Sequence, residues 1–427
     1  HPRAERSADR HLAARRAPRG QARAMASKWT SSANEALCLR LDGAPSPRDR
    51  VFHPDFTYPI FGEAETIFGY QDLHIHLSFA SGSLRPCLDV QYKAKNTKTT
   101  AKIMDVAETL SEFLPADELV APGEWPAVVE AERASFQPHG TRVGSYTRQD
   151  KSRGGAEREF VVFRATFDTP GFRAWHERVQ IFALLFIEGA SYIDDDDTRW
   201  EFYTLFERVQ DRGESWHFVG YTSLYRFWCW PDQTRLRLSQ FVILPPYQQQ
   251  RHGSELYKAV YDAALGDASI CELSIEDPSE RFDRLRDSCD LARLQRDATL
   301  VTKLAAPMDR TWYRAARTQY KMAPRQWARI LEMLALVRLD DEPASLQAYR
   351  LQVKARLYGV NREVLDLLPR EQRLEKLHET FEAVVDEYAE ITGADIPEAL
   401  LARPAAPGER KRAADAGATT SKMPRLL

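Results

Sequence analysis

Glu276 and Asp277 follow a predicted strand, residues 270–275, and precede Pro278 and a helix-like segment. A carboxylate at the end of a strand can act as a general base toward an amine. An aliphatic amine with a pKa of about 10.4 needs such a base before it can react as a nucleophile, because about 99.9% of it is protonated near pH 7. We expect Glu276 to take this role. Asp277 and Glu188, which ends a predicted helix over residues 171–191, are further candidates, although Asp277 before Pro278 could instead cap the next helix.

Another strand followed by a helix-like segment lies just upstream. Residues 241–244 predict a strand buried on both faces. Pro245 and Pro246 end that strand, since proline lacks the N–H that a sheet requires. A polar loop follows, and Gly253 opens an amphipathic segment. Because the N–H groups of a helix's first turn converge, this order predicts a phosphate-binding site. Its candidate residues are Phe241, Val242 and Ile243 on the strand, and Gln248, Gln249, Gln250, Arg251, His252, Gly253 and Ser254 in the loop.

The loop resembles the acetyl-CoA signature of the GCN5-related N-acetyltransferases (GNAT). Further segments resemble one family within them, the type B histone acetyltransferase catalytic subunits: IFGEAETIFGY at 60–70, FIEGASYIDDDDTRWEFYTLFE at 186–207, and VGYTSLYRFWCWPDQTRLR at 219–237. Together with the 270–278 segment they stand in the family's order, over roughly residues 30–340. The resemblance implies acetyl-CoA as co-substrate, no metal, and direct acetylation of lysine in the tail of newly made core histone four before chromatin assembly.

The resemblance also implies roles for individual residues. Glu276 matches the family's general base, and the strand edge at 241–243 would bind the pantetheine arm of acetyl-CoA. An acidic and aromatic groove would hold the histone tail, with Glu63, Glu65, Trp200, Tyr225, Arg226 and Phe227 as the matching positions. The run Asp194 to Asp197 could extend that groove or form a solvated loop. Because side chains alternate along a strand, about half of the aromatic residues near 225–230 are expected in the core. A WD-repeat histone-binding subunit is the implied partner.

One position departs from the family pattern. Relatives commonly read Gln-x-x-Gly-x-Gly in the loop, whereas this chain has Arg251 at the central glycine. If that position requires a positive φ, a side chain there carries a steric cost, although the guanidinium could pair with phosphate. Two alternatives to a histone acetyltransferase therefore stay open: a non-catalytic histone-binding subunit with an impaired acetyl-CoA loop, and an acetyltransferase of a small amine. The acidic groove and the helical C-terminus disfavour the second.

The composition, with 43% hydrophobic and 28% charged residues among 427, is that of a globular protein. No apolar run approaches the roughly 18–20 residues of a membrane span. Five cysteines without paired spacing indicate reduced intracellular thiols and neither disulfides nor a zinc site. His74 and His76 share a strand face, but without a third ligand we expect packing or surface histidines.

The net charge of −3 is unevenly distributed, because both ends of the chain are basic and the body between them is acidic. An acidic body favours a basic partner such as a histone tail and disfavours nucleic acid. Two basic clusters, residues 410–412 and 422–425, resemble a bipartite nuclear-import signal. We therefore expect the protein in nucleus and cytoplasm. The Arg-rich N-terminus could alternatively be an organelle transit peptide, although Glu5 and Asp9 argue against it.

The expected fold class is α+β, with a GNAT-type mixed sheet core, an N-terminal mixed α/β domain and a C-terminal helical domain. The predicted boundaries are 1–26 for a disordered basic extension, 27–138 for the N-terminal domain, 139–295 for the acetyl-CoA-binding core, 296–396 for the helical domain and 397–427 for a disordered basic tail.

Overall fold

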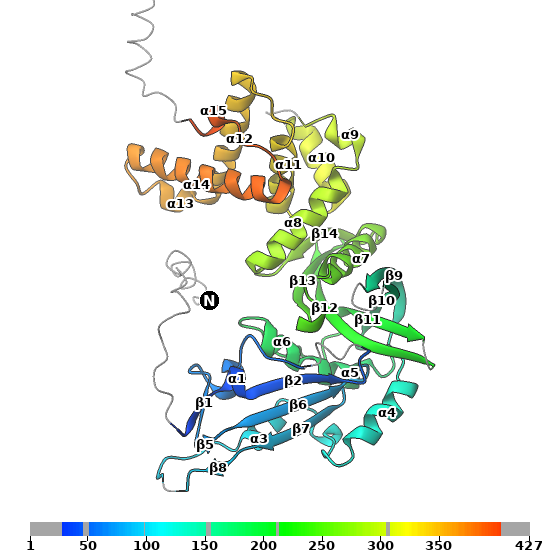
Figure 1. Ribbon diagram of the computed structural model, residues 1–427. Helices are drawn as coiled ribbons and strands as arrows, with labels where there is room; N and C mark the ends of the chain where they lie inside the picture. Colours follow the sequence, from blue (N-terminus) through cyan, green and yellow to red (C-terminus); the bar gives the residue numbers. More distant parts are fainter. Residues whose placement is uncertain are drawn as a thin grey trace, which may run out of the picture. The chain divides into compact units, whose positions relative to one another are not determined.

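The computed structural model describes residues 28–45, 51–97, 99–150, 155–210, 213–304 and 308–402 (Figure 1). They form two compact units. Unit 1 holds the described residues of His1–Pro138, Gly171–Asp194 and Glu207–Phe218, and unit 2 those of His139–Pro170, Asp195–Phe206 and Val219–Leu427. The predicted extension and both basic tail clusters lie outside the described residues. The division into five segments stays a prediction.

Unit 1 is built on a four-stranded sheet in the order β3-β2-β6-β7. Its strands are β2 (Leu37–Asp42), β3 (Val51–Phe52), β6 (His74–Ala80) and β7 (Pro86–Gln91), with β2 parallel to β6. Alternate side chains point to one buried face, where Phe79 contacts Phe182 with ring centroids 4.8 Å apart. Phe182 belongs to α6 (Ile181–Phe186), which follows α5 (Phe172–Val179). The helix predicted over 171–191 is therefore shorter and divided at Gln180.

Smaller elements complete unit 1. They are β1 (Thr30–Ser32), α1 (Ala33–Ala36), α2 (Tyr58–Phe61), β4 (Thr66–Phe68), β5 (Tyr70–Gln71), β8 (Ala94–Lys95), α3 (Val106–Ser111), η1 (Ala116–Glu118) and α4 (Trp125–Ser135). On the outer face of β6, His74 and His76 are exposed, and their rings stack with centroids 6.3 Å apart. Within the described ranges no three His, Cys, Asp or Glu side chains are grouped so that they could hold a metal ion.

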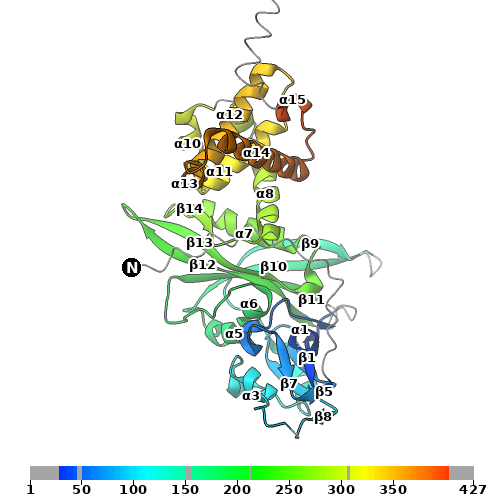
Figure 2. The same cartoon turned by 90° about the vertical axis from the view of Figure 1, so that its left-hand side faces the viewer.

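The second sheet has the order β14-β13-β12-β11-β10-β9. Its strands are β9 (Thr141–Asp150), β10 (Ala156–Thr166), β11 (Trp200–Gln210), β12 (Glu214–Cys229), β13 (Gln233–Ile243) and β14 (Ile270–Ile275). β13 runs antiparallel to β12 and parallel to β14. A parallel pair needs a crossover connection, and here η3 (Pro245–Tyr247) and α7 (His252–Gly266) supply it. Figure 2 shows α7 against the strands of this sheet.

Two expectations about these strands are corrected. Val242 and Leu244 are buried, but Phe241 and Ile243 are only half-buried, so the strand is not buried on both faces. The aromatic residues near 225–230 are not half core, because Phe227 is 36%, Trp228 69% and Trp230 78% exposed. β11 begins at Trp200, and Arg226 N donates to Arg199 O just before that start. Residues of β12 beyond Arg226 therefore extend past the end of β11, which leaves their side chains exposed.

Unit 2 continues into a helical region that α8 connects to the sheet (Figure 1). The helices are α8 (Glu280–Leu294), α9 (Ala298–Val301), α10 (Arg310–Tyr320), α11 (Pro324–Leu336), α12 (Pro343–Val360), α13 (Arg362–Leu365), α14 (Arg370–Thr392) and α15 (Glu398–Leu401). None of the helices in the described ranges is long and apolar enough to cross a membrane. Apolar residues recur at helical spacing over 325–339, 344–359 and 370–391, and the structure has α11, α12 and α14 there, within the segment expected to be helical.

A buried polar network joins α8 to the later helices. Asp287, which is 0% exposed, accepts hydrogen bonds from Arg329 Nε at 2.7 Å and from Gln326 Nε2 at 2.9 Å. Arg329 also donates to Glu387 on α14 at 2.5 Å. Moving α11 or α14 away from α8 would leave a buried charge without its partner, which is costly. The network therefore fixes both helices on α8.

Asp290 lies beside that network, and its buried carboxyl should make the free energy of unfolding depend on pH. Burial raises the pKa of its carboxyl to about 7, while Gln326 and Tyr257 donate hydrogen bonds to it and Arg286 and Asp287 are nearby charges. In the unfolded chain Asp290 ionises near its ordinary value of about 4. The folded protein therefore holds one more proton between these values, and this contribution to the free energy of unfolding is lost as pH rises from about 4 to about 7.

Asp290→Asn should remove this dependence. The free energy of unfolding of the variant minus that of the native chain should increase by on the order of 2–4 kcal/mol as the pH rises from about 4.5 to about 8. Urea unfolding of both proteins at several pH values measures the difference. A difference that stays constant across this range would contradict the assignment.

Candidate active site

The strand β13 has an open edge beyond Leu238. Its pairing with β14 runs from Thr234 to Leu238 and closes with a hydrogen bond from Glu276 N to Leu238 O at 2.9 Å. Among the described residues, no β14 partner pairs with β13 past that point, while β12 continues to pair with it as far as Ile243. The two parallel strands therefore diverge, and backbone groups of β13 are left for another partner.

A bulge in β13, where Ser239 and Gln240 stand opposite Ser223 of β12, decides which backbone groups face that edge. The register shifts between Thr222 and Leu224, and the side chains at the bulge bind the backbone of Gln240: Ser223 Oγ accepts from its N–H at 3.1 Å, and Thr222 Oγ1 donates to its C=O at 2.7 Å. Leu244 N also bonds toward β12, at Val219 O. Since successive residues of a strand point their backbone groups to opposite sides, those of Phe241 and Ile243 face the open edge.

In the loop that follows β13, two residues other than glycine have the positive φ angles that favour glycine. Gln249 has φ 60° and Arg251 has φ 65°, both in the left-handed region. Arg251 is the residue before α7, and its side chain makes no hydrogen bond to the helix's first turn. The expected requirement for positive φ at this position is met, and a non-glycine residue there costs about 1–2 kcal/mol. The first-turn N–H groups of α7 face this loop, as an anion site requires.

Replacing Arg251 by glycine is expected to relieve this strain. The free energy of unfolding should rise by about 1 kcal/mol, because glycine reaches positive φ without a steric penalty while losing some entropy on folding. Thermal unfolding compared with Gly266→Ala, a change inside α7, measures it. If Arg251 instead pairs with phosphate, the same variant should bind acetyl-CoA about tenfold more weakly by calorimetry, because a charge-assisted hydrogen bond contributes about 1.5–3 kcal/mol.

His252 is held inside the unit instead of facing the loop. It is 1% exposed, its Nδ1 lies 2.7 Å from Tyr146 Oη on β9, and its ring contacts Phe160 at a centroid distance of 4.3 Å. Burial lowers its pKa to about 3, so the imidazole is neutral at physiological pH. His252 therefore anchors the first turn of α7, which begins one residue earlier than the sequence predicts. It brings no positive charge for phosphate.

Glu276 sits where β13 and β14 diverge. Ser239 Oγ donates to its Oε2 at 2.7 Å, and Arg237 Nη1 lies 3.6 Å from its Oε1. The side chain of Glu276 is 44% exposed, so a substrate can reach it. Asp277 follows with φ 33° and is exposed. It does not cap α8, because Ser279 does so by accepting from Phe282 N.

A row of ring contacts leads across the sheet to Glu276. Trp200 on β11 meets Tyr225 on β12 with centroids 4.9 Å apart, and Tyr225 meets Phe227 at 4.6 Å. The Arg237 guanidinium then lies 4.5 Å from the Phe227 ring centroid and reaches Glu276. We call Trp200, Tyr225 and Phe227 the aromatic row. Three of the predicted groove residues thus form one surface that ends at the candidate base.

Arg226 has a different environment from its two neighbours. Its guanidinium donates to Glu201 Oε2 at 3.1 Å and to Asp267 Oδ2 at 2.8 Å, on the opposite side of the strand from Tyr225 and Phe227. Asp197, within the acidic run, meets the aromatic row, since it accepts a hydrogen bond from Tyr225 Oη at 2.9 Å. Hydrogen bonds from Arg199 hold the Asp197 pKa well below its usual range, so it stays ionised.

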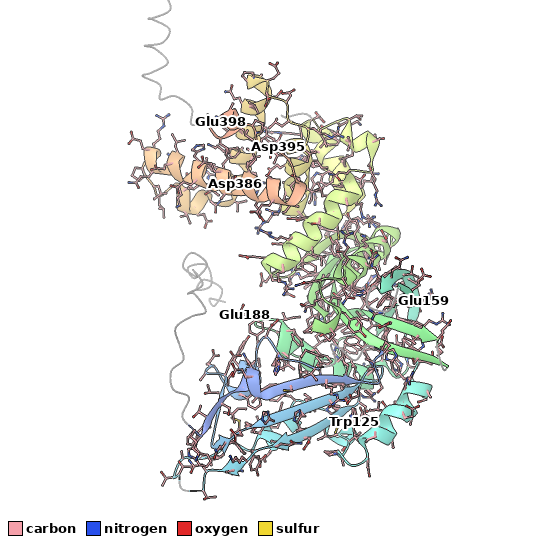
Figure 3. The ribbon with its side chains drawn as sticks, viewed as in Figure 1. Trp125, Glu159, Glu188, Asp386, Asp395 and Glu398 are labelled. Carbon is pink, nitrogen blue, oxygen red and sulfur yellow. The ribbon has the colours of Figure 1, made fainter. Side chains whose placement is uncertain are left out.

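The remaining predicted site residues belong to unit 1. Glu188 is exposed just past the end of α6 (Figure 3). Glu63 is exposed as well, but the Glu65 carboxylate accepts from the backbone N–H of Thr57 at 2.6 Å and of Tyr58 at 3.2 Å. Glu65 therefore stabilises the start of α2 instead of presenting a free carboxylate.

Three side chains of this site were not identified from the sequence. Ser239 and Arg237 both contact Glu276, and Tyr146 bonds His252. The first two could have been found by alternation, because residues 237 and 239 are two apart on one predicted strand that leads to the cofactor loop. Tyr146 had no signal, since only the tertiary fold brings β9 to α7.

Comparison with known proteins decides the family. Residues 29–188 match a family model described as "Histone acetyl transferase HAT1 N-terminus", and residues 287–340 match one described as "Fungal HAT1, C-terminal". The histone acetyltransferase type B catalytic subunit of Mycosarcoma maydis is 48% identical over 415 residues, covering 90% of this chain and 92% of that protein. The chain belongs to this family.

Other type B catalytic subunits agree. Those of Cryptococcus neoformans and Eremothecium gossypii are 42% and 37% identical and cover 86% and 85% of this chain, and 98% and 91% of their own lengths. The resemblance found in the sequence is confirmed, and the protein is a histone acetyltransferase. Acetyl-CoA is the acetyl donor that membership of this acetyltransferase family implies.

One solved acetyltransferase structure overlaps this chain only slightly. An Arabidopsis thaliana NAA60 complex with a bisubstrate analogue is 10% identical, covers 29% of this chain and 80% of its own, and has a TM-score of 0.24. Such an overlap supports no argument about this chain. The mixed sheet, the N-terminal α/β unit and the C-terminal helices are those expected of the α+β class.

Proposed function

We propose that this type B subunit acetylates a lysine in the N-terminal tail of newly synthesised core histone four, before chromatin assembly. The aromatic row that ends at Glu276 carries the proposal. A lysine flanked by glycines suits it, because glycine has no side chain to keep the peptide backbone away from the rings. The acidic body of the chain favours the lysines and arginines elsewhere in such a tail.

The open edge of β13 supports a binding mode for acetyl-CoA. The amides of its pantetheine arm can pair with the backbone of Phe241 and Ile243, as an added strand would. Its pyrophosphate would lie at the loop of residues 248–254 and the first turn of α7. Arg251 and Arg281 are exposed cations beside that turn, and Arg281 Nη2 donates to Gln248 Oε1 at 3.2 Å. The residues present therefore fit the donor.

Glu276 is the general base of the proposed reaction. It removes a proton from the lysine ammonium, and the neutral amine attacks the thioester carbonyl. The C–S bond then breaks, the nitrogen loses its second proton, and the departing sulfur gains one and leaves as the free thiol of CoA. Ser239 supports this role by fixing one carboxylate oxygen through its hydroxyl. Asp277 and Glu188 remain secondary candidates, since both are exposed carboxylates that a substrate could meet. Glu63 and the Asp194 to Asp197 run would attract the basic residues of the tail.

Turnover on defined substrates tests the proposal. The full chain is incubated with labelled acetyl-CoA and a histone-four tail peptide, the same peptide with its lysines replaced by arginine, or the polyamine spermidine. Label should enter the lysine peptide alone. Preferential acetylation of spermidine would support the small-amine alternative and overturn the histone-tail assignment.

The strained loop favours a second reading, a histone-binding subunit with impaired acetyl-CoA binding. Gln249 and Arg251 both occupy positive φ at the cofactor loop, where relatives commonly have glycine at the second of these positions. Calorimetry of acetyl-CoA with the native chain and with Arg251→Gly separates the readings. Micromolar binding by the native chain excludes impairment, whereas binding that appears only in the variant supports it.

A WD-repeat histone-binding partner and a location in nucleus and cytoplasm complete the proposal. Trp228 and Trp230 support a partner, because exposed tryptophans at the end of a hairpin are unusual outside interfaces. Calorimetry with a purified WD-repeat histone-binding protein tests the partner. Fusion of residues 403–427 to a fluorescent reporter tests import, and a reporter that stays cytoplasmic would contradict it.

A further inference from the structure

Arg237 is a charged residue of the site that the reaction, as proposed above, does not use. It lies on β13 opposite Tyr225 of β12 and Ser274 of β14, with its guanidinium between the Phe227 ring and Glu276. Its side chain is 37% exposed, so it borders the path of an incoming substrate. A guanidinium at this position repels the ammonium from which Glu276 must take a proton.

The other charges nearby are paired more closely. Arg235 lies 3.1 Å from Glu272, and Arg199 lies 2.8 Å from Asp197, so the field of each pair largely cancels. Arg237 and Glu276 are 3.6 Å apart, and the second oxygen of Glu276 is bound by Ser239. Among the described residues, Tyr225 lies opposite Arg237 on β12, and the exposed Asp277 follows Glu276 along the chain. Arg237 is thus the cation that acts most directly at the carboxylate.

We propose that Arg237 is a positioning residue for acyl transfer, whose guanidinium orients Glu276 and disfavours the protonated form of the substrate amine. The inference rests on the proposed role of Glu276. To lose its proton, the lysine nitrogen must come within about 3 Å of the Glu276 carboxylate. With Arg237 3.6 Å from one carboxylate oxygen, the two cations are then at most about 9 Å apart, within a Debye length of about 8–10 Å.

The consequence is a lower pKa for the bound amine. Glu276 alone would form an ion pair with the ammonium and favour its protonated state. Arg237 offsets that attraction, as neighbouring cations do for other amines that must be neutral to react. For partly exposed charges at this separation, Coulomb's law gives an effect of about half to one pKa unit on the amine. The proton moves from the amine to the Glu276 carboxylate, and no other reactant is required.

The test is the pH dependence of acetyl transfer in single turnovers, with peptide and acetyl-CoA saturating. In Arg237→Met, which keeps an apolar side chain beside Phe227 but no charge, the midpoint of the rising limb should move up by about half to one unit. The rate at neutral pH should fall about three- to tenfold, and the rates should converge above the midpoint. Arg237→Lys keeps the charge and should keep the native midpoint.

A less basic substrate gives an independent readout. Replacing the target lysine by S-aminoethylcysteine, whose sulfur lowers the basicity of the amine, should restore most of the neutral-pH rate of Arg237→Met. A purely structural role would lower the rate by one factor at every pH, with no change of midpoint and no rescue, and would overturn the inference. The same holds if Arg237→Lys shifts the midpoint as far as Arg237→Met does.

Glu276→Gln, measured alongside, separates this inference from the proposed function. If Glu276→Gln keeps the native rate and pH profile, Glu276 is not the base and both assignments fail. If Glu276→Gln is inactive while the Arg237→Met midpoint is unchanged, the inference about Arg237 fails alone.

Discussion

Glu276→Gln is expected to lower the rate of acetyl transfer about 10²–10⁴-fold, the usual contribution of a positioned general base. The amide is similar in size and can still accept a hydrogen bond from Ser239, but it cannot take a proton from the lysine ammonium. Because the side chain is 44% exposed, the fold should be unaffected. Single-turnover kinetics with a histone-tail peptide measures the rate, and thermal unfolding confirms that stability is unchanged.

The neighbouring carboxylates provide the controls. Glu280→Gln removes an exposed carboxylate from the first turn of α8 and should leave the rate within about twofold. Asp277→Asn and Glu188→Gln examine the two alternative bases. A large loss in either of these, with Glu276→Gln active, would move the role of base to that residue.

Arg329→Met is expected to destabilise the helical region by about 3–5 kcal/mol. The substitution leaves the Asp287 carboxylate, which is 0% exposed, without the cation that pairs with it at 2.7 Å. It also removes the hydrogen bonds from Arg329 to Glu387 that join α11 to α14. Urea unfolding followed by circular dichroism measures the change.

An exposed ion pair between the same region's helices serves as the matched control. Arg284 on α8 and Glu390 on α14 are 2.8 Å apart with side chains 58% and 62% exposed. Arg284→Met should therefore cost less than about 1 kcal/mol. A double variant, Arg329→Met with Asp287→Leu, should recover much of the loss, since apolar residues can replace a buried pair. Equal effects of Arg329→Met and Arg284→Met would contradict the buried-charge explanation.

The elements that place Glu276 could be predicted from the sequence because their signals are local. Pro278 after the strand predicted at 270–275, and the prolines at 245 and 246, mark strand ends directly, and the structure has β14 and β13 there. Parallel pairing of these strands follows from the helix between them. The requirement for positive φ at Arg251 was likewise available from the loop pattern.

The features that were missed depend on neighbours distant in the chain. Whether Trp228 is core or surface depends on where β11 begins, about thirty positions away, and alternation along β12 says nothing of that. Arg226 looked like a groove residue with Tyr225 and Phe227, yet Glu201 and Asp267 bind it on the other side of the strand. The Asp277 cap was wrong because Ser279 competes for the same helix start.

The bulge at Ser239 and Gln240 of β13, opposite Ser223 of β12, sets which backbone groups of that strand reach the active site. A strand has a period of two, so one inserted residue acts as a frameshift that reverses which side every later backbone group faces. Thr222 and Ser223 bind the backbone of Gln240 on the β12 side. The backbone N–H and C=O groups of Phe241 and Ile243 therefore face the open edge. Single-residue insertions or deletions near this bulge would turn those groups away, and only paired changes of length would preserve the cofactor edge.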